Sequence, residues 1–78
     1  MTPTGYTKRL RRERLALGKS ASALSYDARV PAPVLGWIEA GRFTPYPPQL
    51  ERIAKALGFE GDPQELLEDV PDEAAVGS

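Results

Sequence analysis

The chain has 78 residues, with ten lysines and arginines, eleven aspartates and glutamates, and a formal net charge of -1. It contains no cysteine and no histidine, which excludes disulfides, zinc sites of the usual kind and any catalytic dyad that needs either residue. No apolar run approaches the roughly 20 residues of a membrane span and no signal-peptide core follows the start, so we expect a cytoplasmic protein of one domain.

Charge is divided unevenly along the chain. Residues 1–58 hold all ten cations and four of the eleven anions, which gives +6, whereas residues 59–78 hold the other seven anions and no cation. A basic body with an acidic tail suits a polyanionic partner, although an ordinary solvated surface could show the same division. We expect one domain over 1–69 and an acidic, disordered tail over 70–78.

Apolar residues recur at three- and four-residue spacing, and no long stretch alternates with period two, so the sequence predicts an all-α fold of five short helices. The first is expected over 5–17, with Gly18 as its stop. Ser20 is a good N-cap for the second, over 21–28. The residues expected to face inward are Tyr6, Leu10 and Leu17 in the first helix and Leu24 and Ala28 in the second.

The third helix is predicted over 33–40, and prolines decide where it begins. A residue that precedes proline is pushed out of the α region, so Ala32 is expected to be extended. Pro33 suits the first helical position, where its missing N–H costs nothing. Trp37 cannot lie wholly on the inner face, because it sits about 100° around the helix from the inward-facing Ile38.

A fourth helix is predicted over 48–57, after a proline-rich loop, and Gly58 ends it. Asp62 and Glu65 have the spacing of a capping box, with a proline between them at the first helical position. They predict a fifth helix over about 63–69.

Four segments follow one another in an order known from a family of DNA-binding domains: LRRERLALGKS, LSYDARV, IEAGR and LERIAKALG. With them, residues 8–68 resemble the Cro and phage-repressor helix-turn-helix family, often called XRE. In that family five helices surround one small core, the second lies across the DNA backbone and the third enters the major groove. The resemblance implies a transcriptional regulator that binds double-stranded DNA as a homodimer through its fifth helix, with no cofactor, metal or small-molecule substrate.

An enzyme is not expected. Without cysteine or histidine, catalysis would rest on a carboxylate pair, and most carboxylates lie in a tail too short to enclose a pocket. The sequence does not name an operator, and it does not tell repression from activation.

The resemblance also assigns roles to individual residues. Arg14 and Glu39 match an arginine and a glutamate that typically form a partly buried ion pair, the alternative being two solvated surface charges. The residues that match phosphate contacts are Lys19, Ser20, Arg29, Arg42 and Thr44.

The residues that should read bases are unusual. The groove face of the third helix falls on Ala32, Pro33, Gly36 and Trp37, and none of these side chains supplies a bidentate pair of hydrogen bonds. What remains is apolar contact with thymine methyl groups and one indole N–H.

Trp37, Phe43 and Tyr46, with neighbouring prolines, suggest an alternative function. Together they would form an apolar patch that binds a protein, as in an antirepressor, a polymerase-binding factor or an antitoxin-like module. Two further roles stay open for Trp37: it covers the following loop as a small extension of the core, or it wedges or stacks against nucleic acid.

Overall fold

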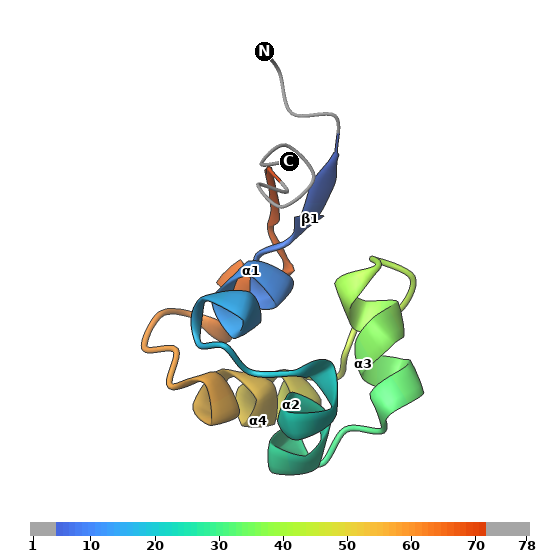
Figure 1. Ribbon diagram of the computed structural model, residues 1–78, viewed down its shortest axis with the longest axis vertical. Helices are drawn as coiled ribbons and strands as arrows, with labels where there is room; N and C mark the ends of the chain where they lie inside the picture. The colour runs from blue at the N-terminus through green and yellow to red at the C-terminus, as the bar shows by residue number, and fades with distance from the viewer. Residues whose placement is uncertain (1–4, 72–78) are drawn as a thin grey trace.

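The computed structural model describes residues 5–71, which form a mostly helical domain (Figure 1). In chain order the elements are β1 (Tyr6–Lys8), α1 (Arg9–Ala16), α2 (Ala21–Ala28), α3 (Ala32–Glu39), α4 (Pro47–Leu57), the 3₁₀-helix η1 (Pro63–Leu67) and β2 (Asp69–Pro71). The all-α prediction is therefore right for the four central helices. It is wrong at both ends of the described region, where the chain forms a small antiparallel sheet.

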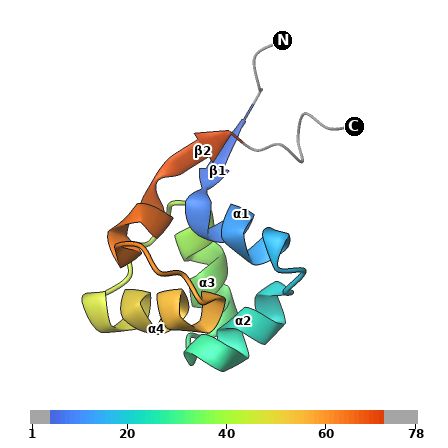
Figure 2. The ribbon, with the colours of Figure 1, turned by 90° about the vertical axis from the view of Figure 1, so that its left-hand side faces the viewer.

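One hydrophobic core connects all four helices and η1. α2 packs against both α3 and α4, and η1 contacts α1 and α4 (Figure 2). The buried apolar residues, none more than 7% exposed, are Leu10, Leu24, Ala28, Val30, Leu35, Ile38, Leu50, Ile53, Ala54, Leu57 and Leu66. Each large side chain among them contributes on the order of 1.5–3 kcal/mol when it leaves water. No helix within residues 5–71 is long and apolar enough to cross a membrane.

The second helix is the one that the sequence predicted best. α2 spans the predicted residues, and the Ser20 hydroxyl accepts a hydrogen bond from the N–H of Ala23 at 3.0 Å, as an N-cap should. Gly18 and Gly58, which were expected to end helices, both have positive φ angles, and so does Gly41 after the third helix.

The first helix begins later than predicted, because residues 6–8 pair with the far end of the domain. Tyr6 lies opposite Pro71 and Lys8 opposite Asp69, and an ion pair joins Lys8 to Asp69 at 2.8 Å. Two residues predicted to face inward do not: Tyr6 is 65% exposed and Leu17 is 57% exposed. A strand of three residues whose partner lies about sixty residues away leaves no local pattern in the sequence.

The starts of the third and fourth helices are each shifted by one residue from the prediction. α3 begins at Ala32, with Pro31 as its N-cap and Pro33 at the second helical position. The steric bias before proline is therefore overcome at Ala32, and Pro33 still loses no intrahelical bond because the first four N–H groups have none to make. α4 likewise begins at Pro47, and the Gln49 side chain accepts a hydrogen bond from the backbone N–H of Tyr46 at 2.9 Å.

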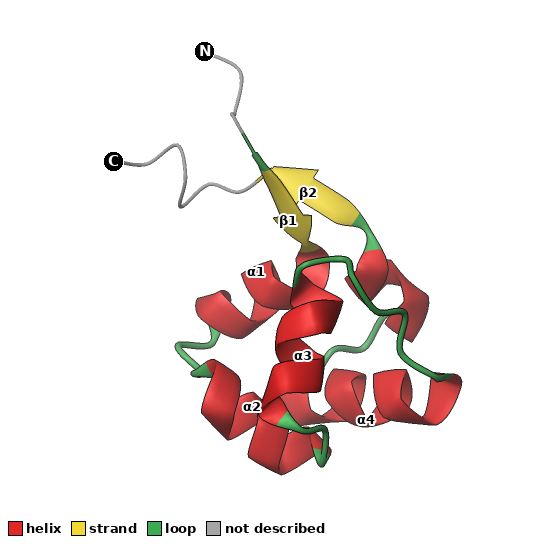
Figure 3. Cartoon of the chain, turned by 90° about the vertical axis from the view of Figure 1, so that its right-hand side faces the viewer, coloured by secondary structure: helices red, strands yellow, loops and turns green. Residues whose placement is uncertain are grey.

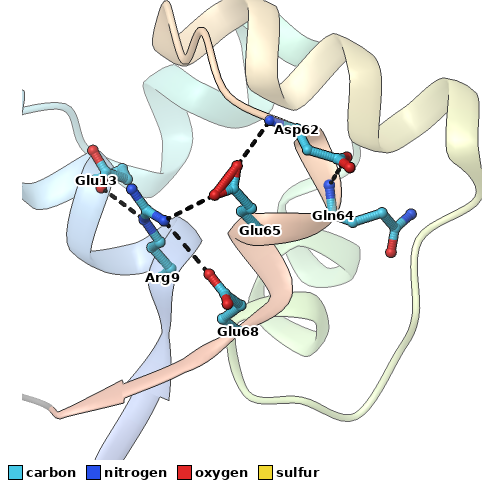
Figure 4. Close-up of polar contacts among 6 residues, drawn as sticks. All are labelled: Arg9, Glu13, Asp62, Gln64, Glu65 and Glu68. Atoms are coloured by element: carbon cyan, nitrogen blue, oxygen red, sulfur yellow. Dashed lines mark hydrogen bonds and ion pairs between the residues drawn. The ribbon is translucent and has the colours of Figure 1, made fainter.

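The predicted fifth helix is a 3₁₀-helix that stops at Leu67. Its capping box is present, because the N–H of Asp62 donates to the Glu65 carboxylate and the N–H of Gln64 donates to the Asp62 carboxylate, both at 2.9 Å (Figure 4). Asp69, predicted as its last residue, lies in β2. So do Val70 and Pro71, which were predicted to belong to the tail, and the rest of that predicted tail lies outside the described residues.

A cluster of charged side chains forms ion pairs between α1 and the region of η1. The Arg9 guanidinium lies within 3.3–3.7 Å of carboxylate oxygens of Glu13, Glu65 and Glu68 (Figure 4). It also stands over the ring of Phe59, 5.0 Å from the ring centroid. The pKa of Arg9 is raised, chiefly by its hydrogen bond to Glu13. Because these groups are largely solvated, we expect the cluster to contribute little free energy beyond that of burying Leu66 in the core.

Candidate nucleic-acid interface

The α2–turn–α3 unit is fixed by a short turn with its own hydrogen bonds. The N–H of Val30 donates to the carbonyl oxygen of Ser25 at 3.1 Å, and the Ser25 hydroxyl donates to the carbonyl oxygen of Val30. Arg29 adopts the left-handed conformation, with φ of 56°, and is the one non-glycine residue of the described chain with positive φ. Val30 is buried at 1% exposure, so the turn is anchored in the core.

Arg14 and Glu39 hold α3 against α1. Arg14 Nε lies 2.8 Å from Glu39 Oε2 and Arg14 Nη2 lies 2.9 Å from Glu39 Oε1, a two-point ion pair in which each side chain is 9% exposed. Arg14 Nη1 also donates to the carbonyl oxygen of Lys19 at 3.0 Å. The hydrogen bond to Glu39 raises the pKa of Arg14 against an opposing effect of burial. These are the two residues that the resemblance paired.

The outer side of α3 faces away from the rest of the domain (Figure 3). Its exposed residues are Ala32, Pro33, Gly36, Trp37 and Ala40 at the C-cap. Trp37 is 51% exposed, and its indole N–H is the one side-chain hydrogen-bond donor among these exposed residues of α3. A Cβ added at Gly36 would meet nothing within 4 Å.

The residues predicted to contact phosphates differ in how available they are. Ser20, Arg29, Arg42 and Thr44 are exposed. Arg42 lies three residues after the end of α3, and its N–H donates to the carbonyl oxygen of Trp37 at 2.8 Å. The Lys19 ammonium, in contrast, is held at 2.7 Å by Asp27 and at 3.2 Å by the carbonyl oxygen of Ala56. We therefore expect Lys19 to contribute least of the five to phosphate binding.

The aromatic residues predicted to form a patch divide between the core and the surface. Phe43 is partly buried against the core and meets the ring of Tyr46 edge-on, with centroids 6.0 Å apart. Pro45 is buried. Trp37 and Tyr46 remain at the surface, at 51% and 66% exposure. The apolar surface near α3 is therefore smaller than the sequence suggested.

Two positioning residues were not predicted from the sequence. The Lys8 side chain lies against the turn that ends α3, with its Cε 3.3 Å from where a Cβ of Gly41 would stand. Arg52 of α4 donates from Nε to the carbonyl oxygen of Ala28 at 2.9 Å, which satisfies a carbonyl at the end of α2. The Arg52 contact joins residues far apart in sequence, and the Lys8 contact depends on the unpredicted sheet.

Among residues 5–71, no group of three or more acidic side chains is placed to hold a metal ion.

The described geometry agrees with a comparison with known families. Residues 7–67 match the family described as Helix-turn-helix domain, which is most of the chain and confirms the resemblance to the XRE group. No curated protein and no solved structure matches the chain. Given the extent of the family match and the presence of two short helices joined by a tight turn, the chain belongs to the helix-turn-helix domain family, whose fold indicates DNA binding.

Proposed function

We propose that the protein is a small transcriptional regulator of the Cro and repressor type, which holds duplex DNA through phosphate contacts and places α3 at the major groove. One observation carries this proposal. The inner side of α3 is fixed by the core and by Arg14 and Glu39, while its outer side is open and exposed basic and hydroxyl side chains precede and follow the helix. A rigid helix that presents one face to the outside is what groove recognition needs.

Two groups of residues would hold the DNA backbone, on either side of the groove face. At one, the exposed Ser20 begins α2, whose first N–H groups can donate to a phosphate. At the other, Arg42 and Thr44 lie in the loop after α3. Arg29, in the turn, is a further exposed cation. Such contacts position a protein on DNA without specifying a sequence.

Homodimerisation is part of the proposal, although the fifth helix is a poor surface for it. Leu66 is fully buried and Leu67 packs against the core, so both leucines are used within one chain. A dimer would need another surface, and sedimentation equilibrium with and without a two-fold duplex would test for it. A cytoplasmic location belongs to the same proposal, because a regulator must reach DNA.

The proposal is tested by fluorescence anisotropy of labelled duplexes, random and selected from a random library, at several salt concentrations. We expect a selected duplex to bind far more tightly than the about 10⁻⁴ to 10⁻⁶ M of non-specific DNA. Arg42→Ala should reduce the log–log salt slope by about 0.9, the value for one phosphate contact. Lys55→Ala removes an exposed cation of α4 that is not among the predicted phosphate contacts, and should leave the slope unchanged.

A second candidate function rests on the exposure of Trp37 and Tyr46. In that case the fold presents these two aromatic residues to a protein instead of DNA. The same experiment separates the two candidates. Binding to selected duplexes no tighter than to random ones, with a salt slope that Arg42→Ala does not change, would contradict the DNA proposal and favour the protein partner.

A further inference from the structure

The outer side of α3 is suited to one particular feature of the major groove. We propose that α3 selects its DNA by apolar contact with the C5-methyl groups of thymine, with Trp37 as the main contact. This inference rests on the proposed function, because it concerns what α3 reads once the protein is on DNA.

The chemistry of the exposed side chains carries the first step. Alanine, proline and glycine have no side-chain donor or acceptor, so Ala32, Pro33 and Gly36 cannot make the bidentate hydrogen bonds that identify guanine or adenine. The one apolar group on the edges of base pairs in the major groove is the thymine methyl. An apolar side chain pressed against the polar edge of a G·C pair would instead leave donors and acceptors without water or a partner, which is unfavourable.

Gly36 carries the second step. A glycine within a helix lowers stability relative to alanine, and a Cβ at this position would meet nothing within 4 Å, so packing within the described chain does not require it. The missing side chain therefore matters only on the outside. There it allows the α3 backbone to approach another surface closely, as a helix must when short side chains are to touch methyl groups in the groove.

Trp37 would supply most of the apolar area of the proposed contact. Its indole is half exposed beside Gly36 and is the one large side chain on the outer side of α3. A helix of eight residues is about 12 Å long, which corresponds to three or four base pairs at about 3.4 Å each. We therefore expect the indole and the neighbouring small residues to cover the methyl groups of a short run of A·T pairs.

Methyl recognition is tested by removing or adding the methyl group without changing the pairing of the bases. Two duplexes of one sequence, each with a run of four A·T pairs in each half-site, are compared by anisotropy, one with thymine and the other with uracil. Burial of one methyl group corresponds to about a fourfold change in affinity, so loss of three buried methyl groups should weaken binding to one half-site roughly sixtyfold. In a G·C duplex, replacing cytosine by 5-methylcytosine should strengthen binding.

Variants assign the effect to α3. Trp37→Ala should bind the thymine and uracil duplexes with nearly equal affinity, and its folding is checked by circular dichroism. Tyr26→Ala, which removes an exposed aromatic residue of α2, should keep the wild-type preference.

Three results would overturn the inference. Equal binding of thymine and uracil duplexes by the wild-type protein would exclude methyl recognition while leaving the DNA-binding function in place. An equal preference in wild type and Trp37→Ala would assign the difference to DNA shape. Absence of salt-sensitive binding to any duplex would contradict the proposed function itself, and the inference with it.

Discussion

The inner and outer sides of α3 differ in almost every physical property. On the inner side Leu35 and Ile38 are fully buried and Glu39 is paired with Arg14, so each side chain has a fixed partner. On the outer side the exposed residues are small, apart from the half-exposed Trp37, and they lie outside the core. The inner side of α3 thus fixes the orientation of the helix, and the outer side is the one proposed to contact DNA. Substitutions on the inner side should mainly change stability, and those on the outer side should mainly change DNA affinity.

The largest effect is expected on the inner side, from Arg14→Ala. This change leaves the buried Glu39 carboxylate without its partner and should lower the free energy of unfolding by about 3–5 kcal/mol. That is a large part of the stability of a small domain. Because the pKa of Arg14 is raised, the titration of Arg14 takes nothing from this contribution below the ordinary pKa of arginine, and the contribution is lost as the pH rises from there through the raised pKa. A change of pH near neutrality therefore brings no change in stability from this group. Urea unfolding measures the loss.

The matched control is the double variant Arg14→Met with Glu39→Leu. Replacing both charges by apolar groups of similar size leaves no buried charge unpaired, so its loss of stability should be much smaller than that of Arg14→Ala. If Arg14→Ala alone lost less than about 1 kcal/mol, the pair would behave as a solvated surface pair, and another contact would have to hold α3.

An intermediate effect is expected on the outer side, from Gly36→Ala. The added methyl meets nothing within the described chain, and alanine favours a helix interior, so the free energy of unfolding should rise by about 0.5–1 kcal/mol. Affinity for a selected duplex should fall in the same variant, because the Cβ intrudes where α3 approaches the groove. Thermal unfolding and anisotropy on the same sample measure both changes.

A rise in stability together with a fall in affinity would support different roles for the two sides of α3. Gly36→Ala that binds DNA as tightly as the wild type would instead show that the backbone of α3 does not need to come close to its target. A fall in stability would mean that the space beside Gly36 is needed within the domain.

The helices that form the motif could be predicted from the sequence because their signals are local. Ser20 precedes α2 as its N-cap, Gly41 follows α3, and the spacing of apolar residues predicts which of them are buried. The ion pair of Arg14 and Glu39 was expected from the resemblance to a family, and no local pattern joins two residues 25 positions apart.

The sheet could not be predicted in this way. Tyr6–Lys8 pairs with Asp69–Pro71 across the whole domain, and neither segment alternates long enough to suggest a strand. The hydrogen bond from Lys19 to the carbonyl oxygen of Ala56 was missed for a related reason, because it depends on how α2 packs beside α4. The contacts that were not predicted thus join segments that only the fold brings together.

The smallest effect is expected in the turn before α3, from Arg29→Gly. A non-glycine residue with φ of 56° carries strain of about 1–2 kcal/mol, which glycine would relieve. Glycine also makes the unfolded chain more flexible, which costs about 0.4–1 kcal/mol. The free energy of unfolding should therefore rise by about 0.5 kcal/mol. Arg29→Ala is the control, because it removes the same charge and keeps the strain. If both variants lower the salt slope of DNA binding equally, the guanidinium contacts a phosphate, and the strain is tolerated for the sake of that contact. If neither lowers it, the prediction for Arg29 is wrong, and the phosphate contacts that remain are those of the α2 N-terminus and of the residues that follow Gly41.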